Sequence, residues 1–323
     1  MGKTKPRKKV AIVLFNLGGP DCQEDVRPFL RNLFSDKAII GLPAIFRLPL
    51  AWLISTLRAP KSKPLYTLMG GGSPLLANTK IQANALQDEL QLRFEDIEIK
   101  TFIAMRYWKP FCKQTAKDVE NYCPDEVVLL PLYPQYSFTT TGSSFVEWGK
   151  YYKKQFREIA DYPQLPGLIS AVADEIMAQY EFIGRPSKVR VLFSAHGLPQ
   201  KNIDNGDPYE TQIGLSVAAV TKLLPDIFEI VTCYQSKVGP LKWLGPSTPE
   251  EIARAGADKI GIILCPIAFV SEHIETLVEL DIEYKELAHE HGVPFFGRAK
   301  TVGAHVDFIK GLADLVDGKL LES

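Results

Sequence analysis

The chain has 323 residues, of which 46% are hydrophobic and 23% are charged, and its formal net charge is −1. This composition is that of an ordinary globular protein, and the length favours two units that can bury their cores without cross-links. The balanced charge lacks the basic excess of nucleic-acid-binding proteins, so no nucleic acid is expected as a partner.

The cysteines and the apolar runs indicate the cellular compartment of the protein. The five cysteines are scattered, odd in number and never in C-x-x-C spacing, which predicts a reducing compartment without a disulfide framework or a zinc site. Residues 1–8 form a basic tail, expected to be disordered, and the short apolar run after it lacks the cleavage site of a signal peptide. Because 18 consecutive apolar residues occur nowhere, no transmembrane helix is expected, and the predicted location is the cytoplasm.

The first predicted elements are a strand, a helix and an unusual apolar stretch. Residues 10–16 read as a buried strand that ends in Gly18-Gly19-Pro20, and residues 24–34 have helical spacing. Residues 42–55 are apolar almost throughout and are interrupted by two prolines. They fit either a surface lip, able to touch a bilayer or admit an apolar ligand, or simple burial.

A loop rich in glycine is predicted next. Arg58, Lys61, Tyr66 and residues 70–74 would bring basic groups, hydroxyls and backbone donors together. Because neither a P-loop nor a G-x-G-x-x-G pattern is present, a nucleotide site is not predicted, and a plain turn before a helix at 76–93 is the alternative.

The next strands, at 98–105 and 126–132, are followed by polar and aromatic residues. Arg106-Tyr107-Trp108 follows the first, and the segment from Tyr133 to Ser144 follows the second. Polar and aromatic groups at strand ends suit a site at the carboxyl edge of a parallel sheet. An amphipathic helix is predicted at 145–159, and residues 161–167 look like a boundary.

The second half repeats this plan. Strands are predicted at 189–194, 228–233, 259–269 and 295–300, with a final helix at 305–316. Similar strand spacing in both halves predicts an α/β protein with two like, doubly wound (Rossmann-like) units, at 9–163 and 164–318. Each unit would have a parallel sheet flanked by helices, and the active-site cleft would lie between them.

The strand at 259–269 leads to the most informative segment. Glu272, His273 and Glu275 follow it, and Glu275, Glu279 and Glu283 are four residues apart, on one helix face. That row is either a solvated face or a set of oxygen ligands for a divalent cation. His196 follows another strand on the tight turn Ser194-Ala-His-Gly-Leu-Pro199, and its near-neutral pKa suits proton abstraction. His196 and Glu275 are therefore the predicted catalytic pair.

Several motifs resemble those of ferrochelatases, which insert ferrous iron into a porphyrin during haem synthesis. They occur in the family's order from about residue 10 to 290, and they cover nearly the whole chain. They comprise Asn16-Leu-Gly-Gly-Pro20, Gly70-Gly-Gly-Ser-Pro74, Arg106-Tyr107, Tyr133-Pro-Gln-Tyr-Ser137, Leu192-Phe-Ser-Ala-His-Gly-Leu-Pro199, Gly206-Asp-Pro-Tyr209, Cys233-Tyr-Gln-Ser-Lys-Val-Gly-Pro240, Trp243-Leu-Gly-Pro246 and the segment from Pro266 to Tyr284.

The resemblance implies a role for each matching residue. His196 corresponds to the family's active-site histidine, and His273 and Glu275 to its metal-and-proton pair. Glu279 and Glu283 match an acidic line along an over-wound helix, an iron or proton route, so the implied metal residues are His196, Glu275, Glu279 and Glu283. The implied porphyrin-binding residues are Leu17, Arg58, Lys61, Tyr66, Ser73, Arg106, Tyr107, Tyr136, Tyr209 and Trp243.

Two departures from the family pattern matter. Phe138 stands where some relatives have a cysteine that binds a [2Fe–2S] cluster, and the chain stops at Ser323 without their C-terminal cysteines. A cluster needs four thiolates, so no bound cofactor is expected, and a monomer is favoured. Glu272 stands where animal enzymes have Asp.

The resemblance implies a lyase that inserts Fe²⁺ into protoporphyrin IX and releases two protons. An apolar, aromatic pocket with cationic and hydroxyl groups at its rim suits this flat macrocycle, with His196 expected on one face and Glu275 on the other. A haem carrier without turnover, or a cobalt chelatase, is the alternative. Peripheral membrane contact is expected through residues 45–54.

Overall fold

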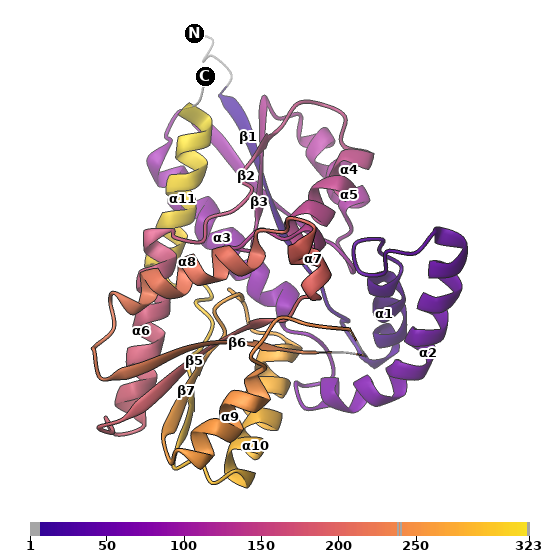
Figure 1. Cartoon of the computed structure of the whole chain (residues 1–323). Helices are drawn as coiled ribbons and strands as arrows, with labels where there is room; N and C mark the ends of the chain where they lie inside the picture. Colours follow the sequence, from indigo (N-terminus) through magenta and orange to yellow (C-terminus); the bar gives the residue numbers. More distant parts are fainter. Residues whose placement is uncertain (1–6, 238, 240, 322–323) are drawn as a thin grey trace, which may run out of the picture.

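Two four-stranded parallel sheets dominate the computed structural model, which describes residues 7–321 except 238 and 240 (Figure 1). The first sheet has the order β2-β1-β3-β4, and the second has the order β6-β5-β7-β8. Both sheets thus follow one order along the chain, which confirms the predicted α/β fold with two like sheets. The strands are β1 (Lys8–Asn16), β2 (Ile97–Met105), β3 (Glu126–Pro131), β4 (Arg157–Glu158), β5 (Val189–His196), β6 (Phe228–Gln235), β7 (Gly261–Cys265) and β8 (Phe296–Arg298).

The strands are apolar because helices cover both faces of each sheet. Along β1, Val10, Ile12 and Leu14 pack into one cluster, while Val13 and Phe15 pack into another on the opposite face. This alternation is the reason that the strand is buried from Val10 onwards.

Helices α4 (Cys112–Tyr122) and α5 (Ser143–Tyr151) cover one face of the first sheet, and α3 (Leu75–Arg93) covers the other. In the second sheet, α6 (Pro166–Phe182) and α8 (Tyr209–Thr221) cover one face, and α9 (Thr248–Ala257) and α10 (Tyr284–Glu290) cover the other. The remaining helices are η1 (Gln23–Asp25), α1 (Val26–Phe34), α2 (Ala44–Thr67), η2 (Phe138–Gly142), α7 (Gln200–Asp204), η3 (Glu275–Glu283) and α11 (Val306–Leu321).

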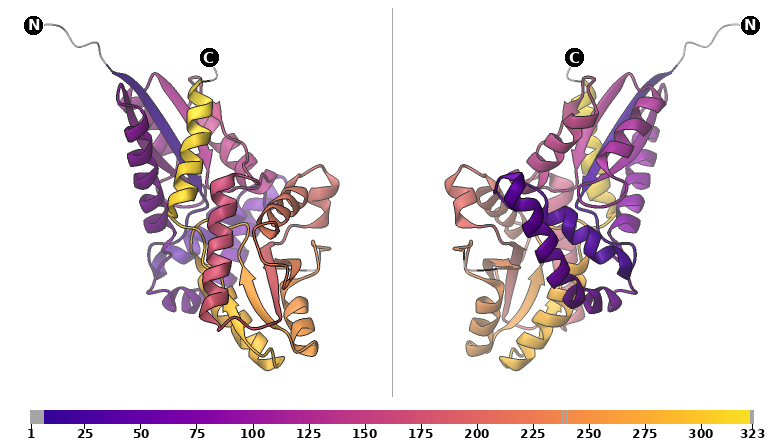
Figure 2. Two further views of the ribbon diagram at one scale, coloured as in Figure 1. Left: turned by 90° about the vertical axis from the view of Figure 1, so that its left-hand side faces the viewer. Right: turned by 90° about the vertical axis from the view of Figure 1, so that its right-hand side faces the viewer.

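The last helix, α11, returns to the first sheet. It packs against α3 and α6, and Arg93 of α3 forms an ion pair with Asp314 at 2.6 Å. Figure 2 shows α11, in yellow, beside the indigo strand β1. One apolar cluster therefore includes residues of both sheets, and the predicted units at 9–163 and 164–318 share it.

Four predicted elements differ from the structure. Arg58, Lys61 and Tyr66 lie on α2, which continues through Pro60 and Pro64, and not in a loop. Both prolines are exposed, so water can bond the carbonyls that lose their donors.

The predicted helix at 145–159 is wrong in its second half: α5 starts at Ser143 and ends at Tyr151, the backbone is extended at Tyr152, and Arg157–Glu158 form strand β4. Strand β7 ends at Cys265 because Pro266 has no N–H to continue the ladder. Lys8 already belongs to β1, and residues 1–6 of the predicted tail lie outside the described residues. Within the described ranges, no helix is long and apolar enough to cross a membrane.

Candidate active site

The predicted catalytic histidine lies at the carboxyl edge of the second sheet. His196 is the last residue of β5 and is paired with Gln235, the last residue of β6. The turn after it requires glycine, because a Cβ on Gly197 would lie 2.9 Å from the Gln235 carbonyl oxygen and 3.3 Å from the Trp243 ring. This close packing places His196 where the strand order favours a ligand site.

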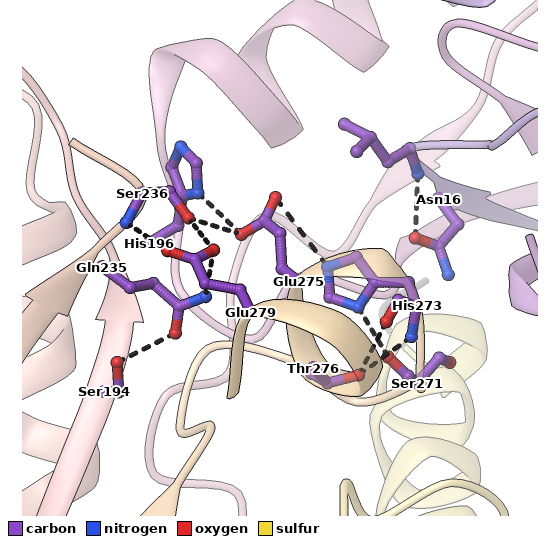
Figure 3. A network of polar contacts seen from close by, with 11 residues as sticks. Asn16, Ser194, His196, Gln235, Ser236, Ser271, His273, Glu275, Thr276 and Glu279 are labelled. Carbon is purple, nitrogen blue, oxygen red and sulfur yellow. Dashed lines mark hydrogen bonds and ion pairs between the residues drawn. The ribbon is translucent and has the colours of Figure 1, made fainter. Parts of the chain in front are cut away.

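His196 and Glu275 meet directly, because Nδ1 of His196 lies 2.8 Å from Oε2 of Glu275 (Figure 3). The expectation that they approach opposite faces of a macrocycle is wrong for this structure, since a planar molecule cannot pass between hydrogen-bonded atoms. The His196 side chain is 39% exposed, so part of its ring remains open to a ligand.

Each member of the pair changes the pKa of the other. Burial works against a charge on His196, but the Glu275 carboxylate outweighs it, and the pKa of His196 rises above its ordinary value. Burial also opposes the charge on Glu275, yet His196, His273 and the Ser236 hydroxyl lower the pKa of Glu275 to about 2. Glu275 therefore stabilises the protonated form of His196 relative to a histidine without such a partner.

His273 lies on the other side of Glu275 (Figure 3). Its Nδ1 is 3.2 Å from the Ser271 carbonyl oxygen, which places a proton on Nδ1 and leaves Nε2 as an acceptor 3.9 Å from Oε1 of Glu275. Burial lowers the pKa of His273, so its ring is neutral near pH 7. The two oxygens of Glu275 thus face two different imidazoles.

Glu279 is held by four donors. The Ser236 hydroxyl donates to Oε2 at 2.6 Å, and the Ser236 N–H and the Tyr284 hydroxyl donate to Oε1 at 2.9 and 2.8 Å. The Gln235 amide completes the set at 3.3 Å. Burial, followed by the charge of Glu275, raises the pKa of Glu279, so Glu279 takes a proton more readily than Glu275.

Glu275 and Glu279 lie on η3, which is a π-helix. A π-helix has i→i+5 hydrogen bonds and fewer turns per residue, so the over-wound helix expected from the family resemblance is wrong. Glu283 is exposed at its C-terminal end. Arg298 holds the helix in place by pairing with Asp281 and, at 2.6 Å, with Glu272.

The acidic residues do not form a ready-made metal cage. Among residues 7–237, 239 and 241–321, no group of three or more His, Cys, Asp or Glu side chains is arranged to hold a metal ion. The nearest donor set is Nε2 of His273 with Oε1 of Glu275, a combination that suits a passing divalent transition metal.

Several predicted macrocycle-binding residues gather beside this pair. Leu17, Tyr66 and Tyr107 belong to an apolar cluster that includes Ile274, the neighbour of Glu275. Burial, followed by the charge of Glu275, raises the pKa of Tyr66, and burial, Tyr234 and Glu275 raise that of Tyr209. Both hydroxyls are therefore close enough to Glu275 to sense its charge.

Arg106 and Tyr107 are engaged elsewhere. Arg106 donates to Asp36 at 2.7 Å and to Ser143 at 2.7 Å, and the Tyr107 hydroxyl donates to Asp36 at 2.8 Å. Tyr107 is only 1% exposed. These residues hold the segment between α1 and α2 against the first sheet.

The other predicted porphyrin residues are spread around the site. Arg58 and Lys61 are exposed on α2, and the Arg58 guanidinium lies over the Phe34 ring. Ser73 donates its N–H to the Pro20 carbonyl at 2.8 Å. The Tyr136 ring contacts Phe138 edge-on. Trp243 is half-buried, and its buried indole nitrogen has no hydrogen-bond partner among the described residues.

Ser236 was missed as a functional residue. It directly follows β6, so the rule that placed His196 at the sheet edge could have found it. Its φ of 63° lies in the left-handed region, which is uncommon for a residue other than glycine and often marks a functional position.

The fold identifies a class of proteins to which this chain is structurally similar. The structure resembles SirB from Bacillus subtilis with Fe³⁺ (TM-score 0.54, 10% identity, 97% of this chain and 96% of that one). It also resembles CbiX, the terminal enzyme of sirohaem biosynthesis in denitrifying bacteria (TM-score 0.52, 13% identity, 96% and 99%). The fold is thus that of the chelatases.

Sequence comparison identifies the family. The ferrochelatase family model matches residues 9–320. The ferrochelatase of Phenylobacterium zucineum is 57% identical over 97% of this chain and 92% of its own, and that of Caulobacter vibrioides is 55% identical over 96% and 90%. The chain belongs to the ferrochelatase family, the lyases of the terminal step of haem biosynthesis.

Proposed function

We propose that this chain inserts Fe²⁺ into protoporphyrin IX to give protohaem and releases two protons. The observation that carries the proposal is the row of His196, Glu275 and Glu279 at the carboxyl edge of the second sheet. Insertion requires a base for the pyrrole protons and ligands that hold the iron while its water leaves. This row and His273 can supply both.

His196 is the proposed proton acceptor. Because Nδ1 contacts Glu275, Nε2 is the ring nitrogen left to meet a pyrrole N–H. His196 must be neutral to accept that proton, and the pair with Glu275 then stabilises the imidazolium that results. Glu275 is thus the group that makes His196 a stronger base.

We propose that Oε1 of Glu275, the oxygen that does not contact His196, binds the iron before insertion. Oε1 of Glu275 and Nε2 of His273 are 3.9 Å apart, and one ion can reach both with bonds of about 2.0–2.2 Å, as zinc forms to such ligands. Glu279 and the exposed Glu283 extend this row to the end of η3. We propose them as the iron or proton route between the site and solvent.

Replacing His196 tests the assignment. We expect His196→Ala to lower the rate of iron insertion by about 10²–10⁴-fold, the usual contribution of a proton-transfer group, while porphyrin still binds. Stopped-flow absorbance measures insertion, and fluorescence titration measures porphyrin binding. An insertion rate near that of the wild type would remove His196 from the mechanism.

The macrocycle is proposed to contact Leu17, Tyr136, Tyr209 and Trp243, with its propionates at the rim near Arg58, Lys61 and Ser73. Exposed cations suit carboxylates, whereas Tyr66, which is 3% exposed, is too deeply buried to reach a propionate without movement. Insertion kinetics with protoporphyrin and coproporphyrin side by side test the substrate, and a preference for coproporphyrin would overturn that part.

The exposed apolar part of α2 is proposed to contact the membrane surface from the cytoplasm. Ile45 is 76% exposed, Phe46 63% and Leu57 63%, a concentration of apolar surface that single scattered residues do not give. We expect replacement of Trp52 and Leu53 by Ser to abolish co-sedimentation with liposomes and leave insertion into detergent-solubilised porphyrin intact. Unchanged co-sedimentation would contradict the assignment.

We also propose that no iron–sulfur cluster is bound and that the protein is a monomer. Phe138 lies on η2, where some relatives have a cluster cysteine, and Cys112, Cys233 and Cys265 are buried separately. Iron and sulfide analysis of protein purified without oxygen tests the first statement, and sedimentation velocity tests the second.

A further inference from the structure

Helix α3 carries an unusual set of buried polar side chains. Asn78 and Thr79 lie four and three residues before Gln82, so the three share one face; Thr79 and Gln82 are 0% exposed and Asn78 is partly buried. A polar face without solvent must find protein partners, because an unpaired amide costs about 1–3 kcal/mol. Its partners are the segments that carry the active site.

Gln82 joins the two sheets. Its Nε2 donates to the carbonyl oxygens of Val270 and Gly303, both at 2.9 Å, and its Oε1 accepts from the Ser271 hydroxyl at 2.7 Å. All three partners follow strands of the second sheet, while α3 belongs to the first. Both N–H groups and the oxygen of the Gln82 amide therefore have hydrogen-bond partners within 3 Å.

The neighbours of Gln82 extend this link. Asn78 donates to the Glu272 carbonyl at 3.1 Å, and Asn16, at the end of β1, donates to the Thr79 hydroxyl at 3.0 Å. One face of α3 therefore holds the segment 270–272 and the strand end that leads to Leu17. The distance between the two sides of the site is set through this helix.

Residues 270–272 lead directly to His273. The Ser271 carbonyl accepts from Nδ1 of His273, and the Phe269 ring packs against the imidazole with centroids 4.6 Å apart. A shift of Ser271 would remove the bond that selects the tautomer with a proton on Nδ1. It would also turn Nε2 away from Oε1 of Glu275.

We propose that Gln82 is a positioning residue that acts through Ser271 to fix the tautomer and orientation of His273. The role of His273 in turnover rests on the proposed function, whereas the orientation of His273 by Gln82 does not. Partners that orient ligand histidines are generally worth about 10–100-fold in activity or metal affinity.

Gln82→Met tests the proposal, because methionine keeps the length and removes the hydrogen bonds. We expect kcat for iron insertion to fall about 10–100-fold with little change in KM for porphyrin. Independently of activity, ¹⁵N spectra of histidine-labelled protein report which ring nitrogen carries the proton. The signals of His273 are identified by their absence from the spectrum of His273→Gln. In Gln82→Met we expect the proton of the neutral His273 ring no longer to reside on Nδ1 alone.

Gln135→Met is the matched control. Gln135 is also a buried glutamine of the first half, and its Nε2 donates to the Ser216 hydroxyl at 2.9 Å and to the Ile267 carbonyl at 3.4 Å, four residues before Ser271, but it forms no hydrogen bond to Ser271 among the described residues. If Gln135→Met changes kcat and the His273 spectrum as Gln82→Met does, a general loss of packing explains the effects of both variants, and the proposal fails. An unchanged His273 spectrum in Gln82→Met also overturns it.

A changed spectrum with a normal kcat would support positioning by Gln82 and refute the proposed role of His273 in turnover. Should Gln82→Met fail to fold, Ser271→Ala removes only the hydroxyl that bonds to Oε1 of Gln82. We then expect the same spectral change at smaller amplitude, and its absence would overturn the proposal.

Discussion

At the scale of single residues, one carboxylate organises the site. Oε2 of Glu275 contacts His196 at 2.8 Å and the Ser236 hydroxyl at 3.4 Å, and Oε1 faces His273. The two oxygens can therefore serve two purposes: Oε2 can stabilise the protonated form of the base His196, and Oε1 can bind iron together with His273. A glutamine at 275 would keep the shape and lose the charge that raises the pKa of His196.

The coupling between His196 and Glu275 predicts a dependence of stability on pH. The pKa of Glu275 is about 2, below its ordinary 4.5, so its contribution is present above pH 4.5 and is lost as the pH falls toward 2. The pKa of His196 is raised, so its contribution is complete below its ordinary 6.5 and is lost as the pH rises above that value.

We therefore expect His196→Ala to reduce the free energy of unfolding most between pH 4.5 and 6.5. The reduction should be about 1 kcal/mol, less than the usual worth of a hydrogen bond to a charged group because His196 is 39% exposed and solvent screens the pair, and it should shrink on both sides of that window. Urea denaturation at a series of pH values measures it. A difference that does not vary with pH would show that the pair is not coupled.

Residues that follow a strand could be predicted, whereas residues that act from a neighbouring helix could not. His196 and Glu275 come after buried strands, and parallel strands bring their carboxyl ends together. Gln82 lies in the middle of a helix, where a polar residue normally faces water. Only the packing of α3 against segment 270–272 gives it a role.

At the scale of elements, a buried carboxylate holds the segment that leads into the apolar helix α2. Asp36, in the segment between α1 and α2, accepts from Arg106, Tyr107 and Ser143. Burial opposes its charge, but the Ser143 hydroxyl and Arg106 outweigh it and lower the pKa of Asp36. The start of α2 is thus tied to the first sheet through Asp36.

Asp36→Asn should break this anchor. Removing one member of a buried ion pair costs about 3–5 kcal/mol, so we expect a loss of that order at neutral pH. Because the folded pKa of Asp36 lies below 3.8, its contribution is present above that pH and is lost as the pH falls. The variant and the wild type should therefore converge in acid.

Chemical denaturation at pH 7 and pH 3 measures this convergence. Asp204→Asn is the control, since Asp204 is exposed and, among the described residues, its carboxylate accepts a hydrogen bond from the Gln200 amide alone. An equal loss of stability in both variants would mean that Asp36 is not an anchor.

The element α2 also marks the limit of prediction from local patterns. The sequence suggested an apolar stretch interrupted by two prolines and then a loop with Arg58, Lys61 and Tyr66, yet the helix runs from Ala44 to Thr67 and contains Pro49, Pro60 and Pro64. Exposure of Pro60 and Pro64 leaves the freed carbonyls accessible to water, and burial of Ala51, Ser55 and Ala59 between them stabilises the helix. The strands other than β4 were predicted because continuous apolar runs identify them without tertiary information, whereas the short polar strand β4 (Arg157–Glu158) was placed in a predicted helix.

At the scale of the whole molecule, the two sheets share one core. Val10 and Leu14 of the first sheet, Val191 and Ile263 of the second, and Leu312 of α11 all belong to the same apolar cluster. Polar links add to it, since Asp207 accepts from the Ser137 hydroxyl at 2.8 Å and from the Phe138 N–H.

A shared core predicts cooperative unfolding. We expect one calorimetric transition in which the calorimetric and van't Hoff enthalpies agree, although the chain has two sheets. Differential scanning calorimetry under reversible conditions measures both enthalpies. Two resolved transitions would show that the halves are separate folding units and that α11 does not join them.

The repeated strand order allows the two sheets to be compared position by position. β1 and β5 are the first strands of their sheets along the chain and occupy the same place in each, yet one ends at Asn16 and the other at His196. A symmetric framework therefore carries asymmetric chemistry. An engineer who wants a different metal or macrocycle could edit one set of strand ends and keep the other as an unaltered scaffold.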